Sequence, residues 1–136
     1  MFKIDNFYTA IDCADPLSLA DFYAAITQFQ VFISDDLNKD EVTWVELRDK
    51  DNQTKLAFQK IANYRQPTWP DGNTPQQAHL DFFVDDLDEA ENHVLALGAK
   101  KADFQPGSPV GPEEIYEFRV YLDLAGHPFC LIRNQN

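Results

Sequence analysis

Apolar residues recur in short runs along this chain, and within the longer runs they alternate with polar residues. Such alternation is typical of strands that bury one face in a core. The pattern predicts eight strands, over residues 7–13, 29–34, 42–48, 56–61, 78–84, 100–105, 115–123 and 128–133. The stretch 62–76 carries three prolines and a glycine, and it predicts a linker near the middle of the chain.

Two segments have helical spacing of their apolar residues instead. The first begins at Asp15, which we expect to be the N-cap, with Pro16 at the first helical position, and it runs to about Gln28. The second begins after Asp86 and ends near Leu97, where Gly98 occupies the usual stop position. Both helices therefore follow a strand directly.

The order of these elements repeats with a constant offset. Asp15 and Asp86 are 71 residues apart (86 − 15), and so are Phe58 and Phe129 (129 − 58). The repeat predicts two βαββ modules, over about residues 1–61 and 77–136, within one domain of 136 residues. We expect an α+β fold in which the modules form an eight-stranded, cupped, mixed sheet with the helices outside. A site built from both halves is then the first hypothesis for function.

Charge and composition exclude several classes of partner. The formal net charge is -12, from 11 basic and 23 acidic residues, and this argues against nucleic acid and against anionic membranes. The acidity indicates either solubility alone or a preference for a cationic ligand. No apolar run approaches the roughly 18 residues of a membrane span. With two cysteines and no secretion signal at the N-terminus, we expect a cytoplasmic protein with free thiols.

Three segments resemble a known family. DCADPLSLADFY, AHLDFFVDDLDEAENHVLALGA and YLDLAGHPFCLI are similar to the glyoxalase/bleomycin resistance/dioxygenase superfamily, also called the vicinal oxygen chelate (VOC) fold, and in particular to its glyoxalase-like domains. The resemblance covers almost the whole chain. The metalloenzymes of this family place four metal ligands on the first and last strands of the two halves. Carried over by the resemblance, these positions are Tyr8, Gln59, His79 and Cys130.

The residues at these four positions depart from the family pattern. The family's metal sites use His, Gln and Glu, whereas here only His79 is a strong ligand, and the carboxylate that would act as a base is missing. We therefore expect no cofactor and no metal site, with a divalent metal at the four positions as the alternative. His79 is then either a hydrogen-bonded strand residue or the catalytic and ligand-binding polar anchor, because histidine can exchange a proton near neutral pH. Cys130 reads as a buried, inert thiol.

Other candidate ligand-binding residues lie on the predicted strands. Alternation places Trp44 and Glu46 on one face of their strand, and Arg119 and Tyr121 on one face of theirs. Trp44 and Tyr121 could line a cavity. Arg119 could hold a carboxylate or phosphate in bidentate fashion, but pairing with one of the many acidic residues is the interpretation we favour.

Three functions follow, from different classes. The first is a small-molecule-binding protein without the usual metal, similar to the antibiotic-sequestering members of the family. If the ligand is cationic, aromatic side chains would bind it by cation–π contacts. The second is a glyoxalase-type lyase, isomerase or dioxygenase with an atypical metal site. The third is an interaction domain without a ligand. The resemblance also implies a homodimer.

Overall fold

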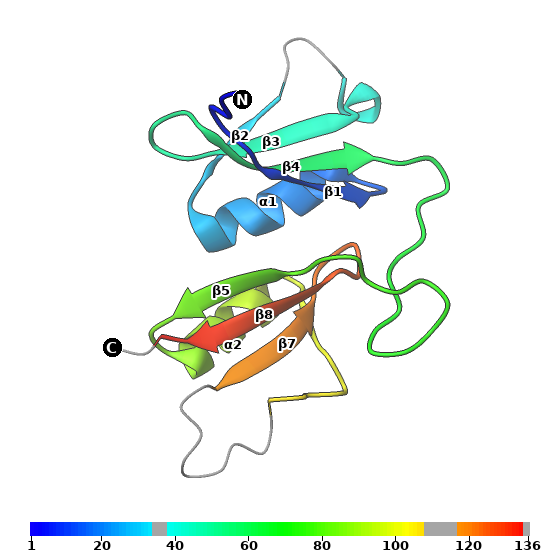
Figure 1. Ribbon diagram of the computed structural model, residues 1–136. Helices are drawn as coiled ribbons and strands as arrows, with labels where there is room; N and C mark the ends of the chain where they lie inside the picture. The colour runs from blue at the N-terminus through cyan, green and yellow to red at the C-terminus, as the bar shows by residue number, and fades with distance from the viewer. Residues whose placement is uncertain (34–37, 108–116, 135–136) are drawn as a thin grey trace. The chain divides into compact units, whose positions relative to one another are not determined.

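The computed structural model describes residues 1–33, 38–107 and 117–134. The chain divides into two compact units, Met1–Tyr64 and Arg65–Asn136, and the boundary falls inside the predicted linker. Among the described residues, each unit contains one α-helix and one four-stranded sheet (Figure 1). Residue 34 and residues 115–116, which belong to the predicted strands 29–34 and 115–123, lie outside the described part of the chain.

The first unit has the order strand, helix, three strands. Its elements are β1 (Thr9–Cys13), α1 (Pro16–Thr27), β2 (Gln30–Phe32), a 3₁₀ turn (Lys39–Glu41), β3 (Trp44–Arg48) and β4 (Thr54–Lys60). The sheet order is β1-β4-β3-β2, with β1 parallel to β4 and the remaining pairs antiparallel.

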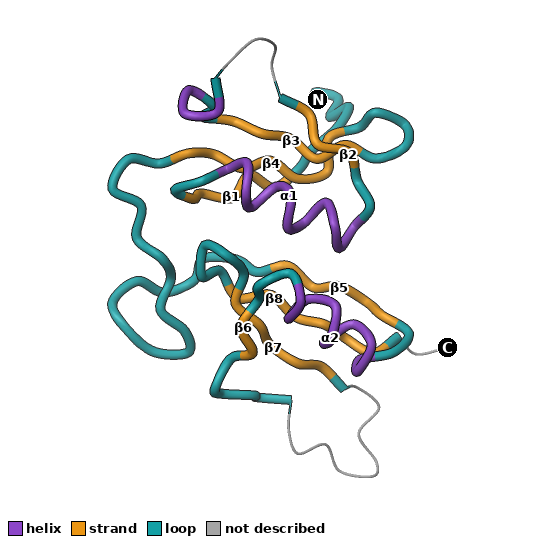
Figure 2. Tube along the Cα trace, turned by 180° about the vertical axis from the view of Figure 1, so that it is seen from behind, coloured by secondary structure: helices purple, strands orange, loops and turns teal. Residues whose placement is uncertain are grey.

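The second unit repeats this topology. Its elements are β5 (Leu80–Val84), α2 (Leu87–Ala96), β6 (Lys100–Lys101), β7 (Phe118–Leu122) and β8 (Pro128–Arg133), and Figure 2 shows β6 beside β7. The sheet order β5-β8-β7-β6 again has one parallel pair, β5 with β8. The predicted α+β class and the two modules are therefore confirmed, with three strands following each helix. Within the described residues, the eight strands form two four-stranded mixed sheets, one in each unit.

Both helices begin where their capping residues predict. The Asp15 carboxylate accepts hydrogen bonds from the backbone N–H of Ser18 at 3.2 Å and from its hydroxyl at 2.6 Å, and Pro16 opens α1. The Asp86 carboxylate accepts from the backbone N–H groups of Asp88 and Glu89, both at 2.9 Å. These bonds fix the point at which the chain leaves β1 and β5, and so they fix the entry into each helix.

Each helix packs on one face of its own sheet, and that face forms the core of the unit. In the first unit, α1 packs on β3 and β4, where the fully buried rings of Tyr23 and Phe58 stack with centroids 5.6 Å apart. In the second unit, α2 packs on β8, and Tyr121, Phe129 and Val94 are buried. Since side chains alternate along a strand, every second residue points to the face that the helix does not cover.

The predicted strand over 100–105 is wrong beyond its first two residues. Beyond Lys101 the pairing is completed by a side chain: the Gln105 amide accepts from the N–H of Val120 at 2.8 Å and donates to the carbonyl of Val120 at 2.8 Å. That carbonyl also accepts from the backbone N–H of Ala102 at 3.0 Å. The Gln105 amide donates in addition to the carbonyl of Ala102 at 2.9 Å. Within the described residues, neither helix has the length and hydrophobicity that a membrane span would need.

Candidate functional site

Three potential ligand groups meet on the face of β5 and β8 that α2 does not cover. His79 and Asp81 are two residues apart and lie on the same side of the chain, and Asp81 pairs with Cys130 across the parallel strands. The His79 Nε2 and an Asp81 carboxylate oxygen are 3.3 Å apart. The ligand atoms of all three residues lie within 4.8 Å of one another.

The cluster is buried on its sulfur side and open on the other. Cys130 is only 8% exposed, because it packs with Ala102 and Val120 in a small apolar cluster. The side chains of His79 and Asp81 are 42% and 44% exposed. Burial, the hydrogen bond to Asp81 and the charge of its carboxylate, in that order of size, together raise the pKa of the Cys130 thiol to about 12. The thiol is therefore protonated at neutral pH in the metal-free protein, as expected for an inert cysteine.

A tight turn places Cys130 opposite Asp81. The buried carboxylate of Asp123 accepts from the backbone N–H groups of Ala125 and His127 at 2.8 and 3.0 Å. Gly126 has φ +84, and a Cβ there would stand 2.9 Å from the Cβ of Gln66, so the turn requires glycine. This turn fixes the start of β8, and with it the register of Cys130.

The donor set of this cluster suits a divalent metal ion. Imidazole nitrogen, carboxylate oxygen and thiolate sulfur are all zinc ligands, and three protein ligands are the number found in catalytic zinc sites. Donor atoms around a tetrahedral ion with bonds of about 2.0–2.3 Å stand roughly 3.3–3.8 Å apart. The separation of 3.3 Å between His79 and Asp81 matches this spacing, so the residues present fit such an ion.

The first unit has a different group of side chains on its uncovered face. The rings of Tyr8 and Trp44 meet edge to face with centroids 6.5 Å apart. Trp44 pairs with Gln59 across β3 and β4, and Gln59 pairs in turn with Asp12 of β1. Tyr8, Asp12 and Gln59 are exposed. Two aromatic rings, an amide and a carboxylate therefore share one end of this sheet face.

At the last strand of each half, strand pairing does not follow the constant offset of 71 residues. Asp81 pairs with Cys130, whereas Ala10, which is 71 residues before Asp81, pairs with Ala57. Ala57 is thus the counterpart of Cys130 by strand pairing, and the offset of 71 that led to Gln59 does not hold there. Because the shift is two residues, Gln59 still lies on the same face as Ala57.

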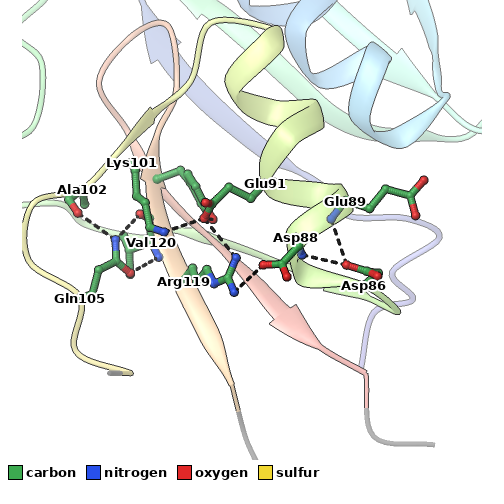
Figure 3. Close-up of polar contacts among 10 residues, drawn as sticks. Asp86, Asp88, Glu89, Glu91, Lys101, Ala102, Gln105, Arg119 and Val120 are labelled. Atoms are coloured by element: carbon green, nitrogen blue, oxygen red, sulfur yellow. Dashed lines mark hydrogen bonds and ion pairs between the residues drawn. The ribbon is translucent and has the colours of Figure 1, made fainter. Parts of the chain in front are cut away.

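The opposite, helix-covered face of the second sheet carries a charged network. The Glu91 carboxylate accepts hydrogen bonds from Lys101 at 2.7 Å and from Arg119 at 3.2 Å (Figure 3). The hydroxyl of Tyr121 also donates to this carboxylate. Arg119 also forms an ion pair with Asp88 at 2.9 Å. Burial alone would raise the pKa of Glu91, but the bonds from Lys101 and Tyr121 and the nearby positive charges hold it below its ordinary value.

The structure brings together some of the predicted site residues and separates others. His79 and Cys130 meet in the second unit, and Tyr8, Trp44 and Gln59 meet in the first. The favoured expectation that Arg119 pairs with acidic residues is confirmed. Arg119 and the fully buried Tyr121 lie on the other face of the sheet from Cys130, since Val120 is the residue that pairs with Cys130.

Sequence reasoning missed Asp81, although a signal was present. In the segment HLD, residues 79 and 81 are two apart on a predicted strand, so alternation alone places both side chains on one face. The four family-equivalent positions themselves contain no carboxylate. The structure supplies one from a neighbouring position on the same strand.

Comparisons with known proteins agree with this architecture. The glyoxalase-like domain family matches residues 8–132. FosX, the fosfomycin resistance protein of Listeria monocytogenes, in a complex with Mn(II) and sulfate, aligns with a TM-score of 0.64 at 12% identity, covering 97% of this chain and 94% of FosX. A glyoxalase/bleomycin resistance protein/dioxygenase family enzyme of Burkholderia phytofirmans PsJN aligns with a TM-score of 0.61 at 16% identity, covering 93% and 95% of the two chains.

A third solved structure shares the fold. TioX of Micromonospora sp. ML1 aligns with a TM-score of 0.59 at 16% identity and covers 94% of this chain and 98% of its own. A search of curated protein sequences finds no match. The repeated module and the solved structures define an α+β protein of the VOC type. The chain belongs to the glyoxalase-like domain family.

Proposed function

We propose that this protein binds a small molecule on the sheet face of the first unit that α1 does not cover. The observation that supports this proposal is the edge-to-face pair of Tyr8 and Trp44, with Gln59 and the exposed carboxylate of Asp12 beside it. An exposed tyrosine and a half-buried tryptophan beside polar groups are typical of ligand sites, and core packing does not require them.

The ligand that suits this face is a small organic cation with an apolar body. The faces of tyrosine and tryptophan rings attract cations, and the carboxylate of Asp12 adds a full negative charge. The formal net charge of -12 attracts cations to the whole chain. Gln59 can both donate and accept hydrogen bonds, so it can orient a polar group of the ligand.

The test is a thermal-shift and calorimetric screen with aromatic and quaternary ammonium cations, and with carboxylate analogues of similar size. A cation that binds the native state should raise the melting temperature in a saturable way. Trp44→Leu should abolish this shift, whereas Trp69→Leu, which replaces the other tryptophan, should keep it. A panel without any stabilising ligand, or an effect that Trp44→Leu leaves unchanged, would contradict the proposal.

A second candidate is metal-dependent catalysis of the glyoxalase or dioxygenase type, and the cluster of His79, Asp81 and Cys130 favours it. These three side chains would hold the ion, which as a Lewis acid would polarise an oxygen of the substrate. Asp81 would provide the carboxylate that the family-equivalent positions lack. In a metal-free catalyst, His79 would instead act as the general base.

Elemental analysis of protein purified without chelator distinguishes a metal-dependent protein from a metal-free one. Metal that is retained by the wild type and lost in His79→Ala supports the second candidate. Activity that persists unchanged in His79→Ala would exclude a catalytic role for this histidine. The homodimer expected from the family resemblance stays a prediction, for which light scattering of the purified protein is the measurement.

A further inference from the structure

We propose that His79, Asp81 and Cys130 form a three-donor site for a thiophilic divalent ion of the zinc class, contained entirely within the second unit. The inference deepens the second candidate function, on which it rests, by naming the class of metal. It keeps two of the four family-equivalent positions, His79 and Cys130, and takes its third donor, Asp81, from outside them, at the position of β5 that pairs with Cys130.

The backbone arranges the three donors without help from a ligand. β5 supplies the carboxylate of Asp81, and His79 directly precedes this strand on the same side of the chain. β8 supplies the sulfur, at the position that pairs with Asp81. The nitrogen and oxygen already stand at 3.3 Å, and the sulfur is within 4.8 Å of both. Side-chain rotations are therefore enough to bring the donors to the spacing of a tetrahedral ion.

The surroundings of the sulfur favour a soft ion. Cys130 packs against Ala102 and Val120, and Trp69, Phe118 and Ile132 extend this apolar cluster. The buried sulfur thus faces the ion from the protein side, while the half-exposed His79 and Asp81 leave access from solvent. A buried sulfur ligand selects zinc, cobalt or cadmium over manganese, magnesium and calcium, which prefer oxygen ligands.

The ion expected at this site differs from the ion found in a protein of the same fold. FosX of Listeria monocytogenes was solved with Mn(II). The sulfur of Cys130 and the presence of only one carboxylate in the cluster make manganese a poor occupant of the site described here. We therefore expect zinc to bind the full chain and manganese to compete with it weakly.

Cobalt titration of the full chain tests the site, because Co²⁺ reports sulfur ligation by a thiolate-to-metal charge-transfer absorption that Zn²⁺ lacks. We expect this absorption in the wild type, its loss in Cys130→Ser, and its displacement by Zn²⁺ but not by Mn²⁺. Cys13→Ser is the matched control, since Cys13 is the other buried cysteine and lies in the first unit. It should keep the full signal.

His79→Gln provides a second variant whose exposed position does not endanger folding. It should keep the charge-transfer absorption and weaken cobalt binding at least roughly tenfold, since loss of even a supporting partner of a metal ligand costs about 10–100-fold. The proposal would be overturned if cobalt does not bind, or if it binds without the absorption. It would also be overturned if the absorption survives in Cys130→Ser, or if His79→Gln binds cobalt with unchanged affinity. Small-molecule binding through Trp44 is measured on chelator-treated protein, so the two proposals fail separately.

Discussion

Asp81 and Cys130 face each other across the parallel pair of β5 and β8, and the Asp81 carboxylate accepts the hydrogen bond of the Cys130 thiol. Two residues that are 49 positions apart in the sequence (130 − 81) thereby form one polar contact at the edge of an apolar cluster. Burial and, to a lesser degree, this contact raise the pKa of the thiol. The contact also holds the carboxylate next to His79.

The first prediction concerns the pH dependence of this thiol. Alkylation of Cys130 in a Cys13→Ser background should follow the pKa of about 12. Asp81→Asn should move the profile to lower pH, but only partway to the ordinary value of 9.0, because burial is the larger cause of the shift. The measurement is the rate of iodoacetamide modification against pH for both variants. A profile that Asp81→Asn leaves in place would show that the carboxylate does not act on the thiol.

The second prediction concerns the network around Glu91. Glu91→Ala should destabilise the protein by about 1–3 kcal/mol, since it leaves the hydroxyl of the fully buried Tyr121 without its acceptor. Glu91→Gln keeps an acceptor oxygen and should cost less. Chemical denaturation of both variants gives the comparison, and equal losses would mean that the hydrogen bond to Tyr121 contributes little.

The same network predicts a dependence of stability on acid. The pKa of Glu91 is lowered in the folded state, so the ionised carboxylate stabilises the fold at pH values above its ordinary pKa of 4.5. This stabilisation is lost as the pH falls through the lower pKa of the folded state. Denaturation at several acidic pH values should show this loss in the wild type and a smaller loss in Glu91→Gln. A loss of equal size in the variant would assign the acid sensitivity to other carboxylates.

The third prediction concerns the core of the first unit. Phe58 is fully buried and stacks on Tyr23, so Phe58→Ala should cost about 3–5 kcal/mol through lost burial and a cavity. Phe83 is 67% exposed, and Phe83→Ala is the matched control that should change stability little. The free energy of unfolding of the two variants decides the matter, and similar values would place Phe58 outside the core.

The fourth prediction concerns the start of α1. Asp15→Ala removes the N-cap and should cost roughly 1 kcal/mol, while Asp15→Asn should keep most of the stability at neutral pH. Hydrogen bonds from Ser18 lower the pKa of Asp15. The carboxylate therefore contributes to stability at pH values above its ordinary pKa of 3.8, and this contribution is lost at more acidic pH. Asp15→Asn should lack this acid-dependent part. Equal stability of the alanine and asparagine variants at neutral pH would contradict a capping role.

Local signals allowed much of the fold to be predicted from the sequence. The caps Asp15 and Asp86 located both helices, because capping depends on residues within one turn. The alternation of β3 correctly separated Trp44 and Glu46 from the buried Val45. The early end of β6 was not visible, since it depends on the Gln105 side chain bonding to Val120, fifteen residues further along the chain.

The candidate site was predicted only in part, and strand register is the reason. A shift of two residues leaves the pattern of apolar and polar positions unchanged, so the sequence could not distinguish Gln59 from Ala57 as the counterpart of Cys130. For the same reason the sequence could not show that Asp81 is the partner of Cys130 across the sheet.

The amide of Gln105 also affects how this sheet meets other molecules. A strand at the edge of a sheet offers unpaired N–H and C=O groups on which a foreign strand can grow, and this is a route to aggregation. At Val120, where β6 has already ended, the Gln105 side chain occupies both groups. Gln105, with the backbone N–H of Ala102 on the same carbonyl, thus leaves neither group of Val120 open to a foreign strand. A longer β6 would have paired with Val120 as well, but it would itself have presented a new edge.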